Sequence, residues 1–153
     1  MKRESASPLG YYTIGIAALF LAGFFLLVVF GAQSYRDTVA GQEANGAARA
    51  QLAYLAAAVK GYDAAGAVHL VEGENGQMLV LEDGESGYAL RIYRLGDTLV
   101  EDYGAAGSPL LPEEANPIGK TARFALETPA AGLLRITTDA GSVLLRLRCG
   151  GAA

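Results

Sequence analysis

The sequence predicts an α+β fold: an N-terminal transmembrane helix continues into an amphipathic helix that packs on an antiparallel β-sheet. Three observations lead to this prediction. An uncharged apolar run covers Tyr11–Phe30, and a helical repeat of apolar residues follows it. From residue 67 onward, apolar residues alternate with a period of two.

The apolar run is long enough to cross a bilayer. No charge lies between Glu4 and Arg36, and a helix needs about 20 apolar residues to cross a hydrocarbon core of about 30 Å. A secretory signal has a shorter apolar region of about 7–15 residues before a small-x-small cleavage site, and only Val29-Phe30-Gly31 loosely fits such a site. The sequence therefore favours a retained transmembrane helix at 11–32, with removal by signal peptidase as the alternative.

Basic residues at the N-terminus predict the orientation of this helix. Lys2 and Arg3 precede the helix, and cytoplasmic flanks favour basic residues. Residues 1–10 are therefore expected to form a cytoplasmic leader. Residues 33–153 are expected outside the cytoplasmic membrane as one α+β domain, because about 120 residues suit a single domain. The expected location is the cytoplasmic membrane, crossed once.

The segment after the apolar run predicts a helix at about 34–61. Apolar residues recur there at spacings of four, three and four, which places them on one helix face: Ala48, Leu52, Leu55 and Val59. Gly61 is a plausible end for this helix. Membrane helix and amphipathic helix are expected to form one rod, straight or bent near Gly31 or Gly41–Gly46.

The remainder, from about 67 to 149, predicts an antiparallel sheet. Turn sequences such as Asn-Gly and Asp-Gly separate seven expected strands: Ala67–Val71, Gln77–Glu82, Tyr88–Arg94, Thr98–Asp102, Ala122–Leu126, Leu133–Thr138 and Ser142–Cys149. We expect one meander of hairpins with one covered face and one wet face. Gly104–Lys120 contains three of the five prolines and predicts a loop from which Leu110 and Leu111 reach the core.

The charge balance disfavours nucleic acid as a default partner. From Gln33 onward the chain has ten Lys and Arg against fifteen Asp and Glu. General nucleic-acid binding depends on neutralising phosphates with basic residues. Membrane lipid and other proteins are the expected partners.

The sequence predicts no enzyme and no cofactor. It contains no phosphate-binding loop, no nucleophile elbow and no Cys-x-x-Cys pair. His69, the only histidine, is expected on the wet face of a strand rather than at a catalytic centre. The acidic pairs in the turns do not follow a calcium-loop pattern, although calcium binding by these loops stays an alternative.

Cys149, the only cysteine, has two interpretations. Its strand face is shared with Val143, Leu145 and Leu147, which favours a buried small apolar residue. An intermolecular disulfide or a lipid attachment is the alternative.

Four arginines are candidates for an interaction face on the exposed side of the sheet: Arg91, Arg135, Arg146 and Arg148. An acidic partner or a DNA strand would suit such a stripe. The alternative is cross-strand pairing with acids such as Glu101 and Glu127, which is worth less than about 1 kcal/mol for an exposed pair.

The order of a short basic leader, a membrane helix, an amphipathic helix and a small antiparallel sheet resembles type IV pilin-like proteins, including minor pseudopilins. More locally, the segments "AYLAAAVKGYDAAGAV", "YRLGDTLVE" and "LLRITTDAGSVLLRLRCG" are similar to an uncharacterised bacterial membrane family, domain of unknown function 4860. The resemblance implies a pilin-like fold and a structural role in a filament.

The resemblance to pilins also implies a peptidase cut after a glycine that precedes the apolar run. Gly10 followed by Tyr11 fits this cut. The fifth mature residue of pilins is normally a glutamate, and here it is Gly15. This departure is compatible with a tip or priming subunit, or with a protein that is never processed. Gly15 and Gly23 would allow close packing of membrane helices.

The leading hypothesis is a minor pilin-like subunit of a type IV pilus, type II secretion or competence-type filament. Its partners would be other pilin-like subunits or proteins of a secretion machine. The alternative is a single-pass anchored module that binds a ligand or a partner outside the membrane and does not polymerise. An anchored hydrolase is a third and weaker hypothesis.

Overall fold

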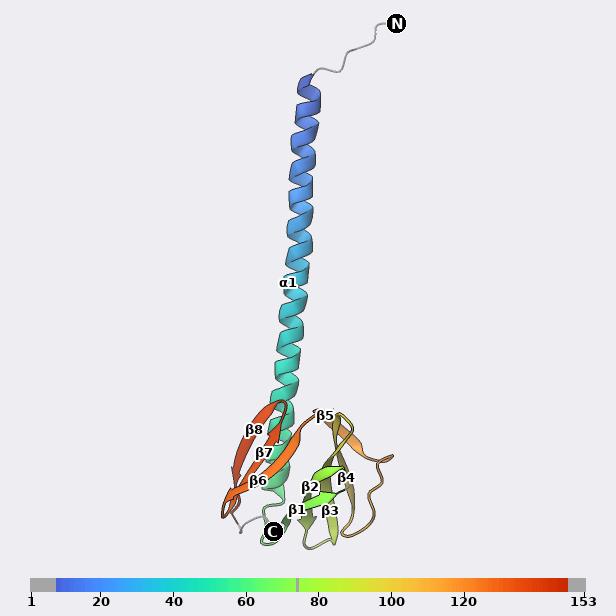
Figure 1. Cartoon of the computed structure of the whole chain (residues 1–153), viewed down its shortest axis with the longest axis vertical. Coiled ribbons are helices and arrows are strands. Elements are labelled where there is room, and N and C mark those ends of the chain that lie inside the picture. The colour runs from blue at the N-terminus through green and yellow to red at the C-terminus, as the bar shows by residue number, and fades with distance from the viewer. Residues whose placement is uncertain (1–7, 74, 149–153) are drawn as a thin grey trace. The chain divides into compact units, whose positions relative to one another are not determined.

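The computed structural model of the chain describes residues 8–73 and 75–148, with side chains from Gly10 onward (Figure 1). One helix, α1 (Pro8–Gly61), precedes the strands. The described strands are β1 (Val68–Gly73), β2 (Gly76–Asp83), β3 (Tyr88–Leu95), β4 (Thr98–Ala105), β5 (Asn116–Lys120), β6 (Phe124–Ala130), β7 (Leu133–Thr138) and β8 (Gly141–Arg146). The α+β class, with a long apolar helix and antiparallel strands, is confirmed.

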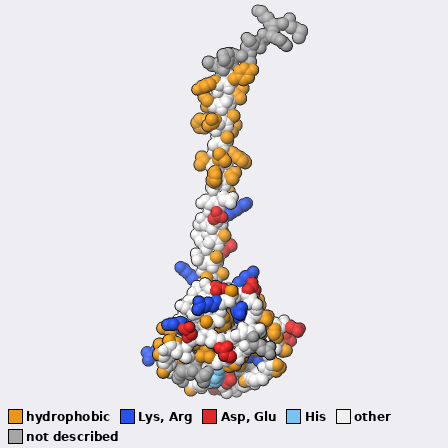
Figure 2. Space-filling view, viewed as in Figure 1, with side chains coloured by type: hydrophobic (Ala, Val, Ile, Leu, Met, Phe, Trp, Pro, Cys, Tyr) orange, Lys and Arg blue, Asp and Glu red, His pale blue; other side chains and the backbone are white. Residues whose placement is uncertain are grey.

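The chain forms two units that meet between Ala44 and Asn45. In the first unit, the described residues are helical throughout, and Figure 2 shows apolar side chains gathered along the N-terminal part of α1. Helical structure continues through Gly31 and Gly41–Gly46, so these glycines do not end the helix.

The strands of the second unit form two antiparallel sheets, so the expectation of one sheet is wrong. The first sheet has the order β1-β2-β3-β4-β5, and the second has the order β6-β7-β8. Six of the seven expected strands overlap a described strand with shifted ends, and β7 has the expected bounds. Strand β5 lies inside Gly104–Lys120, which was expected to be a loop.

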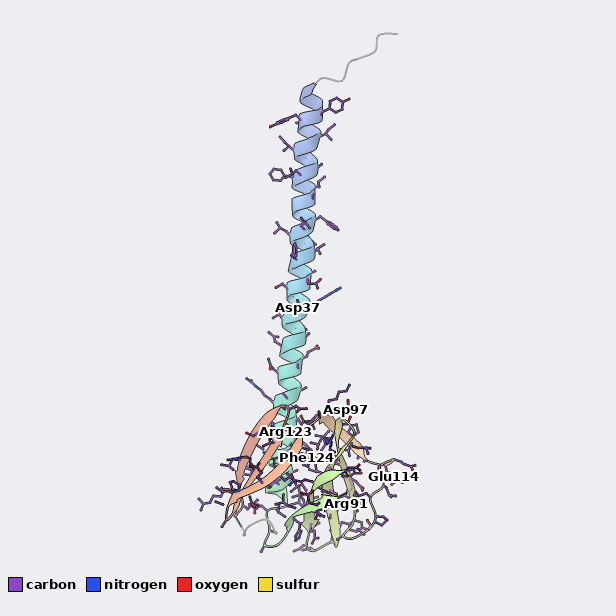
Figure 3. The ribbon with its side chains drawn as sticks, in the orientation of Figure 1. Asp37, Arg91, Asp97, Glu114, Arg123 and Phe124 are labelled. Atoms are coloured by element: carbon purple, nitrogen blue, oxygen red, sulfur yellow. The ribbon has the colours of Figure 1, made fainter. Side chains whose placement is uncertain are left out.

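The change of sheet occurs at Thr121, which is buried. Its backbone N–H donates to the carbonyl oxygen of Asp97 at 2.8 Å, and its hydroxyl donates to the carbonyl oxygen of Arg123 at 2.6 Å. The Thr121 hydroxyl also accepts from the backbone N–H of Asp139 at 3.1 Å. Asp97 and Arg123 are labelled in Figure 3. These bonds join the crossing segment to a turn of each sheet, which ends the meander after β5.

The core lies where the end of α1 meets both sheets. It contains Leu55, Val59, Val68, Leu79, Leu81, Ile92, Leu99, Leu126, Leu134, Ile136, Leu145 and Leu147. A polar clamp crosses between the sheets: the Gln77 side chain accepts from the backbone N–H of Leu126 at 2.7 Å and donates to its carbonyl oxygen at 3.2 Å. Burying each large apolar side chain is worth about 1.5–3 kcal/mol, so this shared core is the main source of stability for the second unit.

The face of β3 that points away from α1 was expected to be wet, and this expectation is wrong. Arg91 and Tyr93 on this face are buried. The Arg91 guanidinium donates to Asp102 at 2.5 Å and to the carbonyl oxygen of Ser108 at 2.5 Å. The loop after β4 therefore covers this face. A Cβ added at Gly104 would lie 3.0 Å from Arg91 Nη2, so a glycine leaves room for the guanidinium.

The same loop places its leucines differently from the expectation. Leu110 is half-buried, whereas Leu111 keeps 49% of its surface exposed. The backbone N–H of Leu111 lies 3.5 Å from Asp102 Oδ2. The polar contacts of Arg91 and Asp102 thus hold the loop, and Leu111 is left outside the core.

Removing one partner of the Arg91–Asp102 pair should strongly destabilise the second unit. Arg91→Met leaves the buried Asp102 carboxylate without a countercharge, so the free energy of unfolding should fall by about 3–5 kcal/mol. The measurement is urea unfolding of the full chain in nonionic detergent micelles, followed by tyrosine fluorescence.

Arg135→Met is the matched control. It breaks an exposed ion pair with Glu127 and should cost less than about 1 kcal/mol. Arg91→Met combined with Asp102→Leu should recover most of the loss, because no buried charge then remains. Losses in the double variant that equal or exceed the sum of the two single losses would contradict this account of the pair.

Candidate functional site

The first candidate surface is the apolar stem, the part of α1 from Gly10 to Tyr35. It carries no charge, and its large side chains are exposed; Leu19 is 75% and Phe20 77% exposed. Within the described residues, α1 is long and apolar enough to cross a membrane. Burial in lipid would gain about 1.5–3 kcal/mol for each large apolar side chain.

Tyrosines lie at both ends of the stem. Tyr11 and Tyr12 stand at one end, and Tyr35 precedes Arg36 and Asp37 at the other; Asp37 is labelled in Figure 3. Aromatic rings with a polar tip favour the interface between lipid and water. A helix rises about 35 Å from Tyr12 to Tyr35, which suits a hydrocarbon core of about 30 Å.

Gly15 and Gly23 of the stem have open space beside them among the described residues. Gly10 and Tyr11 are exposed in the first turns of α1. At Gly15 and Gly23, an added Cβ would meet no atom within 4 Å outside the helix's own backbone. Cleavage after Gly10 and helix packing at Gly15 and Gly23 stay predictions.

The structure divides the four candidate arginines between the two sheets. Arg91 is only 5% exposed and lies in the first sheet, so its expected place on an exposed face is wrong. Arg135 and Arg146 are exposed on the second sheet, and Arg148 follows β8. Arg135 Nη1 lies 3.1 Å from Glu127 Oε2, as cross-strand pairing predicts. No single stripe of four arginines exists.

Two of these arginines instead line what we name the basic groove. Its lining residues are Lys60, Asp63, Leu144, Leu145, Arg146, Leu147 and Arg148. The Asp63 carboxylate accepts from the backbone N–H of Arg148 at 2.7 and 3.0 Å. The arginines were expected at an interface, but Lys60 was missed. Its position in the last turn of α1, where the helix dipole favours a cation, was the available signal.

A second groove, the Tyr93 groove, lies on the first sheet beside the loop after β4. It is lined by Gly73, Asn75, Gly76, Met78, Tyr93, Pro109, Leu110 and Pro112. The Tyr93 hydroxyl is buried and has no hydrogen-bond partner among the described residues. Burial raises the pKa of this hydroxyl. The groove was not foreseen, because the loop and the strands that line it are far apart in the sequence.

The acidic turns and the histidine form no metal centre in the described part of the chain. No group of three His, Cys, Asp or Glu side chains gathers there. His69 Nε2 lies 3.7 Å from Glu82 Oε2, and both side chains are partly exposed. Cys149 lies outside the described residues.

Tyr54 links α1 to β4 by donating a hydrogen bond to Glu101 Oε2. Desolvation, and then this hydrogen bond to the carboxylate, raises the pKa of Tyr54 to about 12. The fold therefore favours the protonated phenol, because an ionised phenol would lose the bond and face the Glu101 charge.

This raised pKa predicts a loss of stability at alkaline pH. The contribution of Tyr54 should be fully present below pH 10, the ordinary pKa of tyrosine, and should be lost as the pH rises from about 10 to about 12. The measurement is urea unfolding of the full chain across this range. Tyr54→Phe should flatten the pH dependence, whereas Tyr35→Phe is the matched control and should not. Equal slopes in all three proteins would contradict the role of Tyr54.

Comparison with known proteins identifies a family for the second unit. The sequence profile described as Domain of unknown function (DUF4860) matches residues 46–140, as the local resemblance predicted. No curated protein and no solved structure matches the chain significantly. The matched segment begins in α1 just before the residues that enter the core and ends at the β7–β8 turn. Because this match covers more than half of the chain, the protein belongs to the DUF4860 family.

Proposed function

We propose that this protein is a minor pilin-like structural subunit of a type IV pilus, type II secretion or competence-type filament. The observation that carries the proposal is the use of one continuous helix for two purposes. The apolar stem of α1 exposes uncharged side chains, whereas Leu55 and Val59 of the same helix are fully buried in the core.

The two parts would act in different surroundings. The apolar stem would store the subunit in the cytoplasmic membrane and pack with the stems of other subunits. Lys2 and Arg3 support a cytoplasmic N-terminus, with the sheets outside the membrane, where they would supply contacts between subunits. The role is structural rather than enzymatic.

Gly15 supports a minor subunit over a main one. In the pilin-like pattern a glutamate at this position neutralises the new N-terminus of a neighbouring subunit. An unpaired charge inside a membrane costs about 2.5 kcal/mol or more. A subunit with Gly15 cannot supply this carboxylate, so its place would be at a tip or in priming.

A specific observation favours the alternative, an anchored binding module that does not polymerise. The Tyr93 groove combines Met78, Pro109 and Leu110 with the buried Tyr93 hydroxyl. Largely apolar grooves with few polar groups are the usual form of ligand sites. This surface would bind a small apolar ligand that carries one hydrogen-bonding group.

Co-expression of the full chain with a prepilin peptidase tests the proposed function. The mature protein should begin at Tyr11, as measured by mass spectrometry, and it should be present in sheared filament fractions. Gly10→Phe should block the cut, because the resemblance places it after this glycine. Gly15→Ala is the matched control and should be cut normally. A chain that keeps Met1 and is absent from filaments, while a known prepilin is processed in the same cells, would contradict the proposal and favour the anchored module.

A further inference from the structure

The basic groove is an unbalanced positive site on an acidic protein. The chain has a net charge of −4, yet Lys60, Arg146 and Arg148 line one groove. None of these three side chains forms an ion pair with another described residue. Asp63, whose carboxylate accepts from the backbone N–H of Arg148, is one acid against three cations among the lining residues, so the positive charge is in excess. The groove therefore suits an anionic occupant.

An apolar residue lies among these cations. Leu144 is 53% exposed and lines the same groove. A simple anion would leave this side chain in water. An occupant that combines carboxylates with an apolar side chain fits the groove better, because it would pair with the cations and cover Leu144 together.

The same chain carries a segment with these properties, which we name the acidic tip: residues Leu111, Pro112, Glu113 and Glu114. All four residues are exposed, and neither glutamate forms an ion pair within the described residues. The backbone N–H of Glu114 donates to the carbonyl oxygen of Leu111 at 3.0 Å, which closes a turn. Arg91 donates to the carbonyl oxygen of Ser108, three residues before the tip, and so holds the start of the loop that carries the tip.

We propose that the basic groove of one copy binds the acidic tip of a second copy. This inference rests on the proposed function, for which it names a contact between subunits. Glu113 and Glu114 face the cations of the groove, and Leu111 covers Leu144. Charge complementarity and a matched pair of exposed leucines carry the assignment.

The positions of the acidic tip and the basic groove on the second unit determine how copies of the chain can assemble. Figure 3 shows Glu114 at one side of the second unit, and Figure 1, in the same orientation, shows β8 at the other side. A tip therefore cannot reach the groove of its own chain. A single contact between two different surfaces is heterologous and leaves a free groove on one copy and a free tip on the other. Copies can then add head to tail.

An anionic lipid surface is a less suitable occupant. A headgroup would supply the negative charge but no leucine side chain near two carboxylates, as the acidic tip does. A projecting loop that carries discrete charges matches a concave site more closely.

Charge reversal tests the contact on the full chain in nonionic detergent micelles, with association measured by sedimentation velocity. Arg146→Glu/Arg148→Glu makes the groove acidic, and Glu113→Lys/Glu114→Lys makes the tip basic. Each variant alone should associate at least about tenfold more weakly than the wild-type chain, because like charges then face each other. An equimolar mixture of the two variants should associate again, because each offers the other an opposite charge.

Matched controls reverse two exposed charges outside both surfaces: Lys120→Glu/Arg123→Glu and Glu72→Lys/Glu85→Lys. These variants should associate like the wild-type chain, which excludes an effect of net charge alone. Circular dichroism melting checks the fold of each variant. Arg146→Gln/Arg148→Gln removes the charge of the groove without reversing it, so it should weaken association by a smaller factor. This variant replaces the charge-reversed groove in the test if the charge-reversed chain does not fold.

Three results would overturn the contact. In the first, either charge-reversed variant associates like the wild-type chain. In the second, the mixture of the two variants does not regain association. In the third, association depends on phosphatidylglycerol added to the micelles instead of on the acidic tip. The last result would assign the groove to a lipid headgroup. The test needs no peptidase and no filament. If the chain associates through tip and groove in micelles but keeps Met1 and is absent from filaments when it is co-expressed with a prepilin peptidase, the contact stands and the proposed function fails.

Discussion

The structure depends on one constraint: a single helix must satisfy different surroundings along its length. The apolar stem exposes side chains that water solvates poorly. Leu55 and Val59, further along the same helix, are buried between two sheets. A helix bonds its own backbone groups throughout, so α1 can cross hydrocarbon and then enter a protein core without leaving backbone N–H groups unpaired.

Polar side chains decide how the sheets are arranged around the end of α1. Thr121 ends the first sheet by bonding to turns of both sheets, and Gln77 joins β2 to β6 through the backbone of Leu126. Arg91 and Asp102 hold the loop over the far face. Apolar burial supplies most of the stability, whereas these bonds select one arrangement, because leaving any of the buried groups without a partner costs about 1–3 kcal/mol.

The helix and most strands could be predicted because their patterns are local. The apolar run, the spacing of Leu52, Leu55 and Val59, and the turn sequences all act within a few residues. The break between the two sheets could not be predicted from the sequence, because it depends on contacts of Thr121 with turns that are distant in the chain. Alternation placed Arg91 and Tyr93 on one face of β3, but it carries no information about the loop that covers that face. The basic groove could be predicted only in part. Arg146 and Arg148 were singled out from the sequence, whereas Lys60 comes close to them only in the folded chain.

Extraction of native membranes with alkaline carbonate, followed by intact-mass measurement of the chain in each fraction, tests most directly whether the stem stays in lipid. The chain should remain in the membrane pellet and should carry its complete stem, beginning at Met1 or at Tyr11. A freely soluble species that begins near Gln33, with no membrane-bound precursor, would contradict the claim that the stem stays in lipid.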